Sequence, residues 1–145
     1  MTQFSFDDSR IQWHALPDIA HLQYWILDVD RSNHIIDVLF KLAAGQRIVL
    51  HRHKVLNKTF VVQGEHRLYE ATGELMEARS AGTYTVSQPT DKPHREGGGE
   101  QDAIVLFSIR GSDGVLYEIL DDEMNRVGEL RWQDFIDLYQ AQTQA

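Results

Sequence analysis

Residues 45–64 read Gly-Gln-Arg-Ile-Val-Leu-His-Arg-His-Lys-Val-Leu-Asn-Lys-Thr-Phe-Val-Val-Gln-Gly, and the rest of the chain is best interpreted around this stretch. Its two histidines, His51 and His53, are two residues apart in a segment typical of a β-strand. Side chains alternate between the faces of a strand, so both imidazoles are expected on the same side. Gly45 and Gly64 indicate turns before and after the segment. The pair is suited to binding one metal ion, although on a solvent-facing strand it would be only a polar row.

A third histidine lies near the end of a later predicted strand. His94 follows Pro89 and Pro93. Because two imidazoles rarely complete a metal site, His94 is our candidate for the remaining ligand. We interpret His14 and His21 as surface or packing residues and expect His34 to be exposed. These three and His66 should be replaceable without loss of metal.

Short apolar segments separated by turn signals dominate the chain. Turn signals recur about every eight to twelve residues, which is typical of a β-sandwich or β-barrel. We predict a hairpin over residues 51–64 and further strands over residues 23–30, 34–42, 66–70, 75–79, 83–88, 103–109 and 115–120. Residues 89–101 are expected to be a loop with a mobile Gly-Gly-Gly centre, either a lid over the site or a surface connection.

The two ends of the chain differ from this pattern. Residues 1–22 form a mixed, polar arm that we expect to cover a sheet edge or reach a neighbouring subunit. Residues 131–142 carry apolar side chains at helical spacing and predict an amphipathic C-terminal helix. Its apolar stripe would pack on the β-structure or on a partner subunit. Together with residues 23–120, these segments are interpreted as one domain.

Composition excludes several classes of function. The chain has 145 residues, a formal net charge of −8 and no cysteine. The missing cysteines exclude disulfides and thiolate zinc sites, and the negative charge argues against nucleic acid. No apolar run approaches the ~20 residues that span a bilayer, and the N-terminal residues lack the pattern of a secretory signal. We therefore expect a cytoplasmic protein without nucleic-acid or membrane partners.

The spacing of these residues resembles the cupin superfamily. Gly45, the His51-x-His53 pair, Asn57 and Gly64 resemble its first motif, in which the position of Asn57 is usually a metal-binding glutamate. Residues 82–94, from Gly82 through Pro89 to His94, resemble the looser second motif. The resemblance implies an all-β cupin/jelly-roll β-barrel over residues 23–120, with His51, His53 and His94 as ligands of a divalent metal ion.

A neutral three-histidine site is similar to that of cupin dioxygenases of the acetylacetone (β-diketone) type. The resemblance implies an Fe(II) site that binds a small substrate as its enolate, with zinc, nickel or manganese as other possible metals. Asn57 would hydrogen-bond substrate or water, or close a turn, and Arg47 would pair with the substrate's charge or extend into solvent. The chain also resembles the cupin domain of zinc-binding anti-sigma factors, so a non-catalytic metal- or metabolite-binding sensor is the alternative. A homodimer or higher homo-oligomer is expected in either case.

Overall fold

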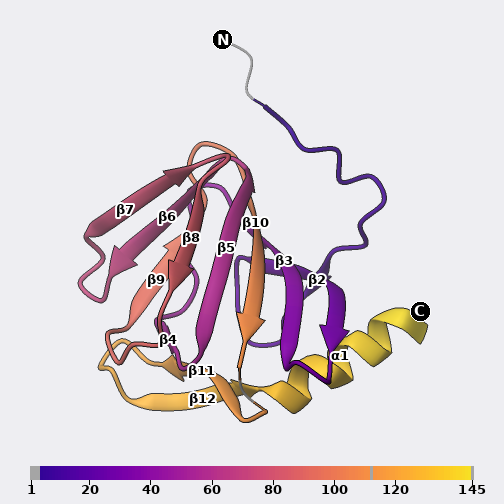
Figure 1. Ribbon diagram of the computed structural model, residues 1–145. Coiled ribbons are helices and arrows are strands. Elements are labelled where there is room, and N and C mark those ends of the chain that lie inside the picture. The colour runs from indigo at the N-terminus through magenta and orange to yellow at the C-terminus, as the bar shows by residue number, and fades with distance from the viewer. Residues whose placement is uncertain (1–3, 112, 145) are drawn as a thin grey trace.

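Two antiparallel six-stranded sheets lie face to face in the computed structural model, which describes residues 4–111 and 113–144 (Figure 1). The first sheet has the order β1-β2-β3-β10-β5-β8. Its strands are β1 (His14–Ala15), β2 (Leu22–Asp30), β3 (Ile35–Leu42), β5 (Leu56–Gln63), β8 (Tyr84–Ser87) and β10 (Ala103–Arg110). The second sheet has the order β12-β11-β4-β9-β6-β7. Its strands are β4 (His51–His53), β6 (Glu65–Glu70), β7 (Leu75–Ser80), β9 (His94–Gly97), β11 (Val115–Leu120) and β12 (Arg126–Arg131), and helix α1 (Trp132–Gln144) follows.

The core lies between the two sheets. Strand β10 is the most apolar strand, and it occupies the centre of the first sheet between β3 and β5. Val105 and Ile109 on this strand are almost completely buried. Because burial of one such side chain contributes about 1.5–3 kcal/mol, this strand anchors the first sheet.

The expected closed barrel and the expected 51–64 hairpin both need correction. Within the described residues, each sheet keeps two edge strands, so the architecture is a two-sheet sandwich. Strand β4 pairs with β9 and β11, whereas β5 pairs with β8 and β10 in the opposite sheet. The backbone N–H of Lys54 bonds the carbonyl of Leu116, which keeps the chain on the second sheet just before it crosses. Apolar alternation is similar in a hairpin and in a sheet-to-sheet crossing, so the sequence pattern did not separate them.

The predicted mobile loop over residues 89–101 was wrong in its centre. Residues 94–97 form β9, and the three glycines that begin at Gly97 are buried. A Cβ atom on Gly97 would lie 1.9 Å from the carbonyl oxygen of Gln46. The glycines therefore allow close backbone packing and are not the hinge of a lid. Strand β12 was not predicted.

Helix α1 packs on its own chain, as one of the two sequence-based alternatives proposed. Phe135 and Ile136 are buried, and the helix contacts β2 and β12. The Gln142 side chain accepts a hydrogen bond from the Ile26 N–H at 3.0 Å and donates one to the Ile26 carbonyl at 2.7 Å. At the other terminus, β1 pairs with the free side of β2, so the N-terminal arm does cover a sheet edge. No helix among the described residues has the length and hydropathy to cross a bilayer.

Candidate metal centre

Strands β4 and β9 bring four polar side chains together in the second sheet. His51 and His94 are directly opposite each other in the antiparallel register, with ring centroids 4.8 Å apart. Residues two apart on a strand share a face, so His53 accompanies His51 and Glu96 accompanies His94. Potential ligand atoms of His51, His94 and Glu96 lie within 4.8 Å of one another.

Glu96 is the centre of this cluster and is only 6% exposed. One carboxylate oxygen lies 2.7 Å from Nε2 of His51 and 3.5 Å from Nε2 of His94. The other accepts a hydrogen bond from Nε2 of His66 at 2.5 Å. Burial alone would raise the pKa of Glu96, but the hydrogen bonds from these three histidines outweigh burial and hold the pKa well below its usual value. Glu96 is therefore an ionised carboxylate inside the protein.

His51 lies between two hydrogen-bond acceptors. Its Nδ1 is 2.8 Å from the carbonyl oxygen of Val49, and its Nε2 faces the Glu96 carboxylate. Burial would lower the pKa of His51, but the interaction with Glu96 outweighs burial and raises it, which favours a proton on the nitrogen that faces Glu96. A metal cation in place of the Nε2 proton would satisfy the same two partners. The donor set therefore fits a divalent metal ion, with the Val49 carbonyl fixing the tautomer of the ligand.

His53 borders the same cavity but is not one of the three most closely grouped side chains. Its ring centroid is 5.7 Å from that of His94, and its Nδ1 is 3.2 Å from the carbonyl oxygen of Val55. Burial lowers the pKa of His53. The ring is thus neutral, with its Nδ1 proton on the Val55 carbonyl, and Nε2 keeps a free lone pair.

Asn57 also borders this cavity, but its amide is already engaged. Its Nδ2 donates to the carbonyl oxygen of Val55 at 3.0 Å, and its Oδ1 accepts from the Tyr117 hydroxyl at 2.6 Å. Burial, and then the charge of Glu96, raise the pKa of the Tyr117 phenol well above its usual value, so it remains a donor. In this arrangement Asn57 positions Tyr117 and the Val55 carbonyl.

Arg47 lies outside the cluster. Its guanidinium is exposed, donates to the carbonyl oxygen of Gly73 at 2.9 Å and stacks 4.8 Å from the Tyr69 ring centroid. The arginine that does line the cavity beside the histidines is Arg79 on β7. Its cross-strand neighbour on β6 is His66.

Sequence reasoning missed two residues of the cluster, Glu96 and His66. Glu96 follows His94 by two residues, as His53 follows His51, and this spacing was a usable signal. It was overlooked because residues 89–101 were interpreted as a loop, where the alternation of a strand does not apply. His66, which the sequence analysis did not connect with the site, is completely buried and contacts Glu96.

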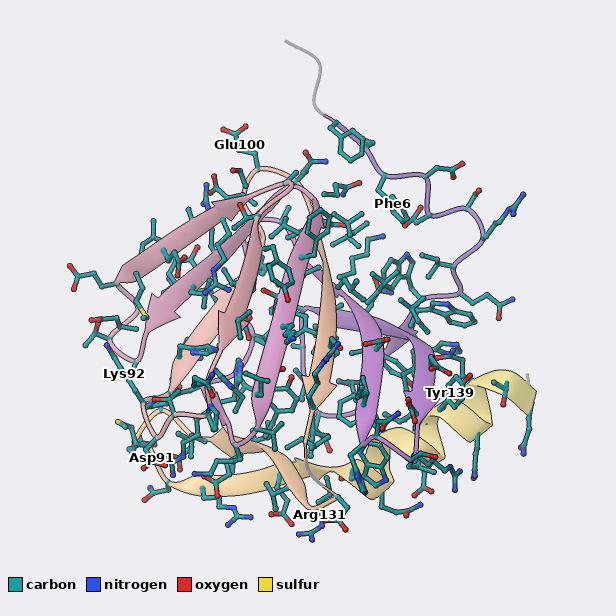
Figure 2. All side chains as sticks on the ribbon, in the orientation of Figure 1. Phe6, Asp91, Lys92, Glu100, Arg131 and Tyr139 are labelled. Atoms are coloured by element: carbon teal, nitrogen blue, oxygen red, sulfur yellow. The ribbon has the colours of Figure 1, made fainter. Side chains whose placement is uncertain are left out.

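Two cavities meet at the cluster, and both include His51 and Glu96 in their walls. The polar cavity contains mainly side chains that form hydrogen bonds: His53, Asn57, Thr59, His66, Arg79, Ser87 and His94. The other is an apolar cavity of about 40 Å³, walled on the far side by residues such as Leu16, Phe40 and Leu130. Outside these cavities, side chains fill the space between the two sheets (Figure 2). The cluster is thus approached from two chemically different sides.

Solved structures identify this architecture. An RmlC-like cupin protein from Ralstonia eutropha JMP134 superimposes with a TM-score of 0.74 at 19% sequence identity, over 99% of this chain and 88% of that chain. The fold is a cupin fold. An acetylacetone dioxygenase from Acinetobacter johnsonii matches this chain with a TM-score of 0.67 at 12% identity, over 98% of this chain and 93% of that chain.

A regulatory protein has the same kind of domain. A structure of SigE in complex with the anti-sigma ChrR from Rhodobacter sphaeroides matches this chain with a TM-score of 0.54 at 22% identity, over 68% of this chain and 49% of that chain. No family model and no curated protein matches the sequence. At these identities the similarity establishes the fold, and function has to be argued from the site.

Proposed function

We propose that this cupin is an iron(II)-dependent dioxygenase that cleaves a carbon–carbon bond of a β-diketone or a related small carbonyl compound. The observation that carries the proposal is the buried grouping of two histidines and one carboxylate, His51, His94 and Glu96. Two histidines and a carboxylate with open coordination positions are the usual ligand set of non-haem iron oxygenases. The acetylacetone dioxygenase among the structural neighbours supports the same class of reaction.

The protein side chains would divide the work between them. His51, His94 and Glu96 would hold the metal, which would supply Lewis acidity and oxygen activation. His53, neutral and with a free Nε2, would be a further ligand or would accept a proton from the substrate. Tyr117 would donate a hydrogen bond to the substrate only if it left Asn57, so we assign this pair a positioning role.

Oxygen consumption by iron-loaded protein tests the proposal. The apoprotein would be loaded with Fe(II) under anaerobic conditions and mixed with a panel of 1,3-diketones and air-saturated buffer. A dioxygenase converts one diketone and one O₂ into a carboxylic acid and a 2-oxoaldehyde, so oxygen uptake and acid formation should be equal. His94→Ala should bind no iron and consume no oxygen. Iron-loaded wild-type protein that consumes no oxygen with any diketone would refute the dioxygenase proposal.

One observation favours a second function, a metal-sensing cupin. The Glu96 carboxylate contacts Nε2 of His51 at 2.7 Å and Nε2 of His66 at 2.5 Å, so it would keep protein partners if a bound metal left. A regulatory site needs two stable states of this kind. Tight, reversible zinc binding without oxygen consumption, together with a change in protease sensitivity on binding, would support this alternative.

A further inference from the structure

The apolar cavity beside His51 and Glu96 adjoins a groove at the molecular surface. It shares five lining residues with a surface groove of about 530 Å³: Leu16, Ile19, Val49, Ile119 and Leu130. We call these five residues the neck. Ile119 lies opposite His51 in the β11–β4 pairing, so the neck begins one strand away from the cluster. The groove itself lies between α1, β12 and the segment of residues 16–19.

The dimensions of the two spaces differ strongly. The inner cavity, at about 40 Å³, is far smaller than the ~150 Å³ needed to hold a benzene ring. It therefore has room for a small terminal group of a substrate, of the size of an acetyl methyl, while the groove can hold a much larger body. Ring-sized groups would have to stay on the groove side of the neck.

The mouth of the groove is acidic. Asp18, Glu129, Asp134 and Asp137 line it, and no lysine or arginine belongs to the lining. Among the described residues, the ion pairs at this mouth involve Glu129, which Arg126 and Arg131 neutralise. Asp134 accepts a hydrogen bond from the backbone N–H of Arg131 at 2.7 Å. The mouth thus keeps a negative field, which repels anions and admits neutral or cationic molecules.

We infer that this groove and neck are the substrate entrance, and that they select an uncharged or cationic carbonyl compound with one small, unbranched apolar end. The small end passes the neck and lies beside His51 and Glu96, and the larger part remains in the groove. This inference rests on the proposed function, because it concerns the substrate of the same metal centre. It requires that a β-diketone enters in its neutral form and loses its proton only inside.

Binding of two simple probes, measured separately from catalysis, tests the entrance. 2-Hexanone is a neutral methyl ketone, and hexanoate carries a similar unbranched chain with a negative charge. Saturation-transfer NMR on metal-loaded protein should show binding of 2-hexanone and at least about threefold weaker binding of hexanoate, because each mouth carboxylate opposes the anion. The double variant Asp18→Asn/Asp137→Asn should strengthen hexanoate binding about two- to fourfold at low salt and leave 2-hexanone unchanged.

Two size variants test the neck. Ile119→Trp fills the neck and should abolish 2-hexanone binding. Val127→Trp at the exposed mouth should weaken 2-hexanone binding, and it provides the test if Ile119→Trp does not fold. Met76→Trp is the matched control, since Met76 is exposed on β7 away from the groove, and it should bind as the wild type does.

The outcomes separate the two proposals. Equal binding of hexanoate and 2-hexanone, or full 2-hexanone binding by the folded neck and mouth variants, would overturn the entrance whatever the enzyme's activity. Selective 2-hexanone binding without oxygen uptake on diketones would overturn the dioxygenase proposal and leave the entrance standing.

Discussion

Replacing Glu96 by glutamine tests which side chains bind the metal. The sequence predicts His51, His53 and His94, whereas the structure groups His51, His94 and Glu96 most closely. Glutamine has the shape of glutamate but lacks the anionic oxygen. If Glu96 is a ligand, Glu96→Gln should weaken metal binding by more than the ~10–100-fold typical of losing a residue that only hydrogen-bonds a ligand. At tenfold per 1.4 kcal/mol, a 100-fold loss corresponds to ~2.8 kcal/mol.

The metal-free protein should be affected much less. The glutamine carbonyl can still accept the hydrogen bond from His66, and its amide can donate to an unprotonated His51. Two charge-assisted hydrogen bonds become neutral ones, but the cost of burying a carboxylate disappears at the same time. We expect a net loss of about 1–2 kcal/mol and a fall in Tm of about 2–8 °C.

The matched variant is His53→Gln, and both proteins would be titrated with Fe(II) anaerobically or with Zn(II) against a chelator. Loss of affinity only in Glu96→Gln supports the two-histidine, one-carboxylate set. Loss in both variants indicates four ligands. Metal binding by Glu96→Gln within about tenfold of the wild type, with a large loss in His53→Gln, would refute the assignment of Glu96 as a ligand.

Three further predictions concern pH, packing and assembly. Because the pKa of Glu96 is lowered on folding, its charge stabilises the metal-free fold above pH 4.5, and this stabilisation is lost as the pH falls through the folded pKa. Because the pKa of His51 is raised on folding, its protonation stabilises the fold below pH 6.5, and this stabilisation is lost as the pH rises through the folded pKa. Urea unfolding should therefore show that the stability difference between wild type and Glu96→Gln is largest between pH 4.5 and 6.5, and a difference independent of pH would contradict this. Gly97→Ala should lower the free energy of unfolding by about 2–4 kcal/mol, since its Cβ would meet the carbonyl oxygen of Gln46. Gly128→Ala, whose Cβ would make only ordinary contacts with Ile119 at 3.8–3.9 Å, should cost under about 1 kcal/mol. Light scattering should show a dimer at micromolar concentration. Replacing the exposed Tyr84 by lysine should dissociate this dimer, and a monomeric wild-type protein would exclude the assembly.

The dimer expectation now depends on a different surface from the one that suggested it. The apolar stripe of the C-terminal helix is covered by its own chain and is not free to bind a partner. The first sheet instead exposes large apolar side chains, namely Leu27, Phe60, Tyr84 and Val86. Phe60 and Tyr84 are cross-strand neighbours at the β8 edge, and an apolar patch beside an open edge is typical of a contact surface.

The strands of this protein were largely predictable where apolar alternation is strong. Residues 103–109 were predicted as a strand and form nearly all of β10, and the predicted 115–120 strand coincides with β11. The predicted 131–142 helix corresponds to α1 within two residues. Local side-chain pattern decides such elements, because each buries a continuous apolar face.

The pairing of strands and part of the metal cluster were not predictable in the same way. Whether β4 pairs with β5 or with β9 depends on contacts distant in sequence, which local alternation does not encode. Glu96 was missed because a glycine run after it resembles a flexible loop, although these glycines serve close packing against Gln46. His66 is on a strand whose alternation was visible, but only the neighbouring β9 reveals that it faces a carboxylate.

The hydrogen bonds between Gln142 and Ile26 also bear on how the protein folds during synthesis. The two residues are 116 positions apart, so the side chain that completes the outer edge of β2 leaves the ribosome long after β2 itself. The central strand β10, which β3 and β5 both need as a partner, also emerges late. Contacts so distant in sequence slow folding, and the early strands would meanwhile expose unpaired edges. The outer edge of β2 therefore stays incomplete until helix α1 has been made.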